Sequence, residues 1–238
     1  EALARIAAAR GVELRLGTPV TRIVRDRRRV LGVETATGER IDADLVVSNA
    51  PGVATYARLL DPPVGALVRR TTALPLQSPG VAAYLHAEVE PSVPFLQFYL
   101  PGGGEACRFF VIAGAVEDWR GGTLGFVAPT DQAWAEREGG GVQRAALERL
   151  LDEPWWRPGV GAHEVVASRV PVEWGHEFHL WRDSMNPTMT AELLRHGRLA
   201  HRSPVADNLL LCGSATHPGQ WVSFCAMSGV LAVDRGRR

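Results

Sequence analysis

The sequence predicts a mixed protein of the α/β (α+β) class that is built from two domains. Short strand-like segments separated by turn residues fill the first 60 residues, and a buried strand followed by a helix ends the chain. Between them, prolines punctuate a series of strand-like runs that have one apolar face. The 238 residues, 46% of them hydrophobic, suffice for one large domain or two small ones, and they are too apolar for a disordered chain.

The charged residues exclude several classes of function. All 26 basic residues are arginines, so Schiff-base chemistry and P-loop phosphate binding, which need lysine, are ruled out. The 26 acidic residues bring the net charge to zero, and we therefore expect no nucleic-acid partner.

The cysteines and the apolar runs indicate the compartment. Three widely spaced cysteines fit neither a disulfide framework nor a zinc site, which favours a reducing, cytoplasmic location; they are Cys107, Cys212 and Cys225. No apolar run reaches the roughly 18 residues of a membrane span, although peripheral contact with a membrane stays open.

The first 60 residues read as a helix followed by four strands. Apolar side chains recur at helical spacing up to Gly11, and β-rich segments follow at residues 12–16, 20–24, 30–35 and 40–47. In the last segment, apolar and polar residues alternate at first, and the final residues are all apolar, as in a strand that enters a buried sheet. It ends in Ser-Asn-Ala-Pro-Gly at residues 48–52, a loop able to present backbone groups to a ligand.

The middle of the chain predicts an antiparallel sheet and a helix. Strand-like runs are expected at residues 81–86, 95–100, 108–113, 123–127 and 164–170. A helix is expected over 131–152, interrupted by the glycines at 139–141, and residues 171–203 show no period and are interpreted as irregular connections.

The most informative segment is a strand, a glycine loop and a helix at residues 208–212, 213–219 and 220–235. This order brings unpaired backbone N–H groups and the positive end of a helix to one point, which suits an anionic or electron-rich ligand. An ordinary strand-to-helix turn would have the same spacing, and both interpretations stay open at this stage.

Two segments resemble a known family. Residues 212–219, Cys-Gly-Ser-Ala-Thr-His-Pro-Gly, with Ser-Gly at 228–229, are similar to the C-terminal flavin-contacting motif of phytoene desaturase-like FAD-dependent oxidoreductases, within the flavin amine oxidase superfamily. The opening, with its helix, β-meander and return strand ending in Val-Ser-Asn-Ala at 47–50, resembles the same family. The intervening residues match only in pattern.

The resemblance implies roles for eight cofactor-binding residues. Val20 would pair with the adenine end of FAD, and Asn49 and Ala50 would border the cofactor after the return strand. The remaining five would lie along the flavin, from the ribityl chain and pyrophosphate to the pyrimidine edge of the isoalloxazine: Gly213, Ser214, Gly219, Trp221 and Val222. A helix start at that edge would stabilise the negative charge of reduced flavin.

The sequence departs from the family at two places. Gln220 and Trp221 stand where relatives often have a further glycine and a smaller residue, which leaves the size of the substrate in doubt. No GxGxxG occurs, and the glycines at 102–104 and 139–141 do not make one. With Glu1 as the first residue, the chain is expected to cover the C-terminal half of such an enzyme; the N-terminal half was removed or comes from a partner chain.

The resemblance then implies a domain organisation and a function. Residues 1–60 and 204–238 would form part of a discontinuous FAD-binding domain of the glutathione-reductase-like type that lacks its N-terminal βαβ unit, and 61–203 a substrate domain with a mixed or antiparallel sheet. The parent would be an FAD-dependent oxidoreductase that moves a hydride between flavin and an apolar, polyene-type substrate. Two alternatives stay open: an amine oxidase-like flavoprotein, and a non-catalytic half-domain that cannot hold FAD alone.

Other candidate sites are weaker, and no residue is named as catalytic. His176 to His179 is not an HExxH motif and predicts no metal site, and no GxSxG indicates a serine hydrolase. Under the resemblance His176, His179 or Asp183 could act on a proton beside the substrate, although structural roles are commoner. The arginines at 25–29 are interpreted as a solvated hairpin tip.

Overall fold

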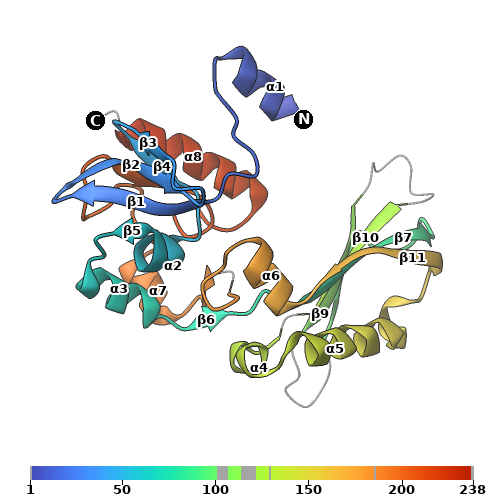
Figure 1. Ribbon diagram of the computed structural model, residues 1–238. Coiled ribbons are helices and arrows are strands. Elements are labelled where there is room, and N and C mark those ends of the chain that lie inside the picture. The colour runs from blue at the N-terminus through green and yellow to red at the C-terminus, as the bar shows by residue number, and fades with distance from the viewer. Residues whose placement is uncertain (1, 101–106, 114–121, 129, 185, 237–238) are drawn as a thin grey trace. The chain divides into compact units, whose positions relative to one another are not determined.

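The computed structural model describes residues 2–100, 107–113, 122–128, 130–184 and 186–236 (Figure 1). The chain folds into two compact units, unit 1 with Glu1–Thr72 and Arg198–Arg238, and unit 2 with Ala73–Gly197. Unit 1 is therefore discontinuous in sequence. The roles predicted for the two domains, cofactor binding and substrate binding, stay predictions.

Unit 1 contains two sheets. One has the strand order β3-β2-β1-β5, in which β1 pairs antiparallel with β2 and parallel with β5; the other is the parallel pair β13-β4. The elements of unit 1 are α1 (Ala2–Ala9), β1 (Val20–Asp26), β2 (Arg29–Thr35), β3 (Arg40–Asp42), β4 (Val46–Ser48), α2 (Gly52–Ala54), the π-helical turn η1 (Thr55–Leu59), β5 (Leu60–Asp61), α3 (Gly65–Thr72), β13 (Leu209–Leu211) and α8 (Val222–Gly236).

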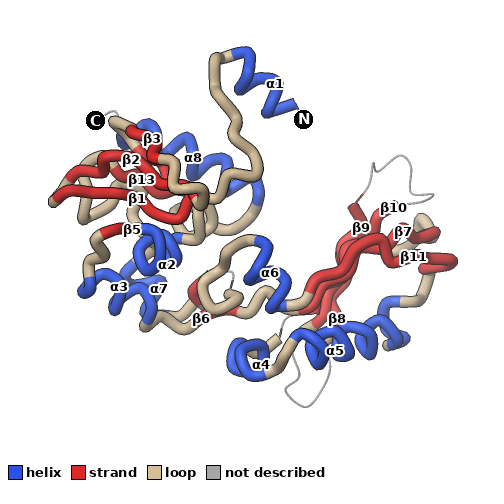
Figure 2. Tube along the Cα trace, viewed as in Figure 1, coloured by secondary structure: helices blue, strands red, loops and turns tan. Residues whose placement is uncertain are grey.

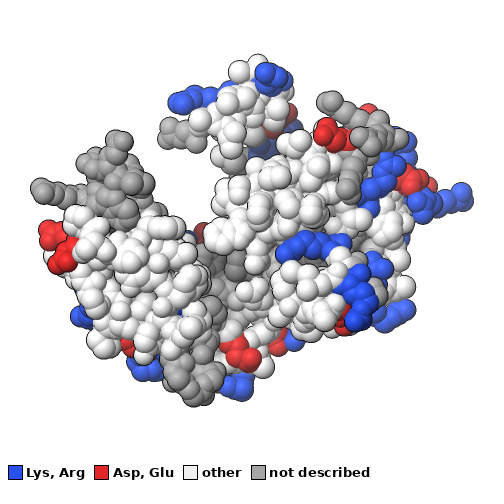
Figure 3. All heavy atoms as spheres, turned by 180° about the vertical axis from the view of Figure 1, so that it is seen from behind, with Lys and Arg blue, Asp and Glu red and all other residues white. Residues whose placement is uncertain are grey.

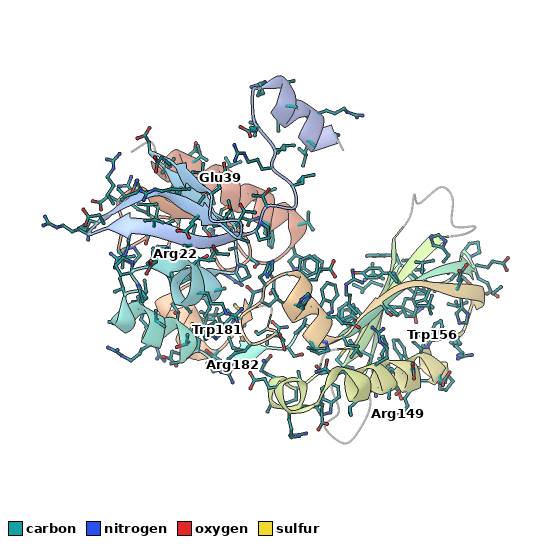
Figure 4. The ribbon with its side chains drawn as sticks, in the orientation of Figure 1. Arg22, Glu39, Arg149, Trp156, Trp181 and Arg182 are labelled. Carbon is teal, nitrogen blue, oxygen red and sulfur yellow. The ribbon has the colours of Figure 1, made fainter. Side chains whose placement is uncertain are left out.

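The core of unit 1 joins its two sequence segments. Residues from both contribute to one cluster of buried side chains: Ile23, Val30, Tyr56, Leu60, Leu67, Ala206, Leu209 and Leu211. At the surface, Arg22 on β1 forms ion pairs with Glu34 on β2 and Asp61 on β5, so its guanidinium links three neighbouring strands (Figure 4). Burial of the apolar cluster supplies most of the stabilisation, because exposed ion pairs contribute little.

Unit 2 is built around a five-stranded antiparallel sheet of order β11-β7-β10-β9-β8 (Figure 2). The elements of unit 2 are β6 (Leu76–Gln77), β7 (Val81–Val89), β8 (Leu96–Tyr99), β9 (Arg108–Ala113), β10 (Gly122–Ala128), α4 (Gln132–Arg137), α5 (Gly140–Asp152), the 3-10 turn η2 (Pro154–Trp156), β11 (Val160–Arg169), α6 (Pro171–Glu177), β12 (Asn186–Pro187) and α7 (Ala191–His196).

The two faces of this sheet differ. On one face, Leu85 and Leu124 pack with Leu147 of α5 and with Trp156, and all four side chains are buried. On the other face, Tyr84 and Phe98 are exposed. The strict alternation of β7 between buried and exposed residues from Ala83 to Val89 follows from the period of two of a half-buried strand.

Several expected elements differ from the structure. The segment 12–16, predicted as a strand, is an exposed loop, and the strand predicted over 40–47 is divided into β3 and β4, which belong to different sheets. The interruption predicted near the glycines at 139–141 is confirmed, because the segment 131–152 forms the two helices α4 and α5. Residues 171–203, expected to be irregular, contain α6 and α7. The glycines at 102–104 lie outside the described residues.

Candidate functional site

The predicted cofactor loops meet in unit 1. Asn49 and Ala50 follow β4, and Gly213 and Ser214 come shortly after β13. Because β4 and β13 pair in parallel, their carboxyl ends lie at the same edge, which is where α/β sheets bind ligands. The backbone N–H of Cys212 donates to the Ser48 carbonyl at 2.9 Å, so the pairing continues into the loops.

Gly213 is the point of closest approach between the two loops. Its φ of +91° lies in the left-handed region, and a Cβ placed on it would lie 2.2 Å from Oδ1 of Asn49. Neither the conformation nor the space admits a side chain without movement of Asn49. The glycine therefore allows the two loops to approach each other at this edge of the sheet.

A buried pair of hydroxyls holds this loop to α8. The N–H of Gly213 donates to Oγ of Ser228 at 3.0 Å, and Oγ of Ser228 lies 2.6 Å from Oγ1 of Thr216. Thr216 Oγ1 in turn donates to the Gly213 carbonyl at 2.9 Å, and both hydroxyl side chains are fully buried. This closed set of bonds fixes the loop against the helix, since opening it would leave buried polar groups unsatisfied.

The loop after β4 is fixed in a similar way. Oγ of Ser48 lies 2.9 Å from Oγ1 of Thr55 in a buried contact. Gly52, the first residue of α2, lies close to the loop at 213–219. A Cβ added to Gly52 would lie 2.7 Å from Cβ of Ala215 and 2.5 Å from the side chain of Leu199. Small residues at these positions thus allow both loops to pack together.

The start of α8 faces open space. Trp221 and Val222 are 71% and 89% exposed, while Gly219, with φ of +148°, is buried. The amides of a first helical turn have no partner within the helix, and in a helix of 15 residues they carry partial positive charge. A negatively charged or electron-rich group would be stabilised here.

Val20 is the one predicted site residue outside this group of loops and helix start. It begins β1, lies opposite Thr35 of β2 in the four-stranded sheet, and is 40% exposed. Its predicted contact with the adenine end of FAD stays a prediction.

The residue that sequence reasoning missed is Arg198. Its Nη1 donates to the carbonyl oxygen of Ser214 at 3.0 Å. It precedes the glycine loop by 15 positions and belongs to no recognisable spacing, so nothing in the sequence signals the contact. Only the fold places it there.

The thiol of Cys212 is unreactive by its environment. Burial raises the pKa of Cys212 above its ordinary value, and the neighbouring Cys225 raises it further. Because the thiolate is the reactive form, this shift disfavours a nucleophilic role for Cys212. All three cysteines are free thiols.

The candidate proton-transfer residues lie in unit 2. His176 and His179 are exposed and line a surface hollow whose charged residues are paired, Arg144 with Glu173 and Arg169 with Glu177. Arg169 holds the pKa of Glu177 below its usual value. Asp183 is not in this hollow; its carboxylate packs against Gly175. Any role of these groups in proton transfer stays a prediction.

Two further searches concern metals and membranes. Among the described residues, no cluster of three or more His, Cys, Asp or Glu is placed to hold a metal ion. Within the same part of the chain, no helix combines the length and the apolar character needed to cross a bilayer.

Comparison with known proteins identifies similar chains. The family described as flavin containing amine oxidoreductase matches residues 1–235. A zeta-carotene-forming phytoene desaturase from Myxococcus xanthus is 40% identical over 85 residues, which are 36% of this chain and 16% of the relative.

Two solved structures share the fold over nearly the whole chain. An oxidoreductase from Methanosarcina mazei superimposes with a TM-score of 0.65 and 16% identity, over 98% of this chain and 52% of its own. Wild-type putrescine oxidase bound to putrescine superimposes with a TM-score of 0.60 and 22% identity, over 99% of this chain and 52% of its own. The chain thus spans about half the length of these structures.

Proposed function

The chain belongs to the family of flavin-containing amine oxidoreductases, and from this premise we propose that it is the C-terminal part of an FAD-dependent oxidoreductase that acts on an apolar, polyene-type substrate. Membership implies a flavin cofactor; FAD is the form proposed. The polyene is favoured by the local identity to the Myxococcus xanthus desaturase.

The observation that carries the proposal is the meeting of the two loops at one edge of β4 and β13, beside the start of α8. The close approach of Gly213 to Asn49 brings the two loops together at this edge, with no side chain on Gly213 between them. This is the cradle that a bulky dinucleotide needs, so the residues present fit FAD. When bound, FAD supplies the two-electron chemistry, and the start of α8 would stabilise the negative charge of its reduced form.

The open face of the sheet in unit 2 supports an apolar substrate. Phe98 of β8 is 63% exposed and lies against Phe109 of β9, with ring centroids 5.7 Å apart. On β7, the ring of Tyr84 lies against Gly125 of β10, where a Cβ would be 3.8 Å from it. An aromatic sheet face of this kind binds a long hydrocarbon by burial of apolar area.

We further propose that unit 1 binds an N-terminal βαβ unit carrying GxGxxG, as part of the same polypeptide or as a separate chain. Most side chains of α8 are apolar, and several of these are exposed: Val222, Met227, Val230 and Val233. In the view from behind, wide areas of the surface carry neither Arg nor Asp nor Glu (Figure 3). A helix of this composition is normally covered, and a parallel pair of two strands is rarely stable alone.

A cytoplasmic location with peripheral membrane contact completes the proposal. Phe95, Phe98 and Leu100, at and beside the edge strand β8, are all more than half exposed. Exposed aromatic and aliphatic side chains of this kind insert into a lipid interface. Replacement of Phe95 and Leu100 by serine should abolish sedimentation with phosphatidylcholine vesicles, with Phe178→Ser, an exposed aromatic away from β8, as the control.

The test of the function uses the chain alone and the chain joined to the dinucleotide-binding half of a desaturase. We expect the joined protein to retain FAD, with absorption bands at about 370 and 450 nm. The chain alone should retain FAD much more weakly. Anaerobic addition of a polyene should bleach the band near about 450 nm, whereas bleaching by putrescine instead would favour the amine oxidase alternative. A folded, joined protein that stays colourless with added FAD would support the non-catalytic half-domain and overturn the proposal.

A further inference from the structure

Arg198 lies beside the glycine loop at residues 213–219. Its Nη1 donates to the Ser214 carbonyl at 3.0 Å. A Cβ added to Gly219 would lie 3.5 Å from Nη2 and 3.7 Å from Cζ of the same guanidinium, so the group lies near this glycine, on the side where another residue would carry a side chain. One side chain is therefore bonded to one residue of the loop and lies near a second.

The backbone beside Arg198 reinforces this contact. The N–H of Leu199 donates to the Ala215 carbonyl at 3.2 Å, and Leu199 forms a parallel bridge with Thr216. Because the backbone is anchored at the adjacent residue, the half-buried arginine side chain is held at the loop rather than sampling solvent. Its planar fork of donors suits two contacts at once, which a lysine ammonium does not provide.

The charge of Arg198 adds to that of the helix start. Residues 213–222 contain no acidic side chain. The first turn of α8, directly after this loop, carries the partial positive charge of the helix dipole. The two positive groups lie at the same segment of unit 1.

We propose that Arg198 is a positioning residue of the flavin site, which holds the loop at 213–219 through the Ser214 carbonyl and favours the negatively charged reduced flavin over the oxidised form. This inference rests on the proposed function. It assigns to a residue outside both family-like segments a part in setting the reduction potential of the bound cofactor.

The first test needs no cofactor. Amide hydrogen exchange of residues 213–219 is compared in the chain alone for the wild type, Arg198→Met and Arg198→Lys. We expect exchange about tenfold faster in Arg198→Met, because the bond to the Ser214 carbonyl is lost, and an intermediate rate in Arg198→Lys. Arg195→Met, an exposed arginine on α7, is the matched control and should leave the rate unchanged. Equal exchange rates in all four proteins would overturn the claim that Arg198 holds the loop at 213–219.

The second test measures the reduction potential of FAD in the joined protein. We expect Arg198→Met to weaken binding of reduced relative to oxidised flavin about tenfold, a shift of about −30 mV for a two-electron couple. Arg198→Lys should retain the wild-type potential because it keeps the charge, a result that a merely structural role does not predict. An unchanged potential in Arg198→Met overturns the inference. Failure of the wild type to bind FAD would overturn the proposed function instead, and the exchange result would stand.

Discussion

Replacing Gly213 by alanine tests the geometry on which the candidate site depends. At φ of +91°, an L-residue is strained by about 1–2 kcal/mol. The added Cβ would also lie 2.2 Å from Oδ1 of Asn49. Because this oxygen ends an exposed, flexible side chain, moving it aside should cost about 1 kcal/mol, at the low end of the usual range for overpacking. We therefore expect Gly213→Ala to lower the free energy of unfolding by about 2–3 kcal/mol.

Two further variants separate the strain from the contact. Gly38→Ala, in the turn between β2 and β3, has a similar φ of +82° but nothing within 4 Å of its Cβ, so it should cost only the strain, about 1–2 kcal/mol. The double variant Gly213→Ala/Asn49→Ala removes the clashing side chain. Its loss of free energy of unfolding should therefore match that of Gly38→Ala.

Urea unfolding followed by far-UV circular dichroism measures these differences. Fluorescence is the poorer probe, because Trp221 is the only tryptophan of unit 1 and its side chain is exposed. If Gly213→Ala proved no more destabilising than Gly38→Ala, the expected clash between a side chain at position 213 and Asn49 would be refuted.

Two predictions concern buried hydroxyls of unit 1. Ser228→Ala leaves the N–H of Gly213 without its acceptor and should cost about 1–3 kcal/mol in urea unfolding, whereas Ser223→Ala, exposed on the same helix, should change stability little. Burial raises the pKa of Tyr56 above its ordinary value, so the unfolded chain ionises first, and the linked stability is full below about pH 10 and falls as the pH rises further. Tyr56→Phe should lose about 0.5–1.5 kcal/mol at neutral pH, with the bond to Ser203, and show a shallower decline at alkaline pH; an equally steep decline would contradict it.

Local patterns predicted the elements whose structure is local. The strand predicted at 108–113 is β9, and those at 20–24 and 30–35 are β1 and β2 with slightly different ends. These strands are bounded by turn residues and show the period of a half-buried sheet. In a hairpin the partner strand follows directly in the sequence, so the pairing is local. The motif at 212–219 was also recognisable, because its residue types are contiguous.

The errors have a common physical cause. Residues 12–16 have the composition of a strand but no described strand pairs with them, and a strand without a partner is not stable. Helices α6 and α7 have only 7 and 6 residues, and helices so short depend on packing rather than on their own sequence. Composition and periodicity carry no information on such packing.

By itself, the sequence determined the class of the fold, the strands with local partners and the family. Each of these depends on residues that are near neighbours along the chain. Only the tertiary structure decided that Asn49 meets Gly213, that Ser228 holds the loop, and that Arg198 binds the Ser214 carbonyl. These contacts depend on the parallel pairing of β4 with β13. Along the sequence, all of unit 2 lies between these two strands. A pairing at that separation is selected by burial of a shared core and leaves no periodic signal in either segment.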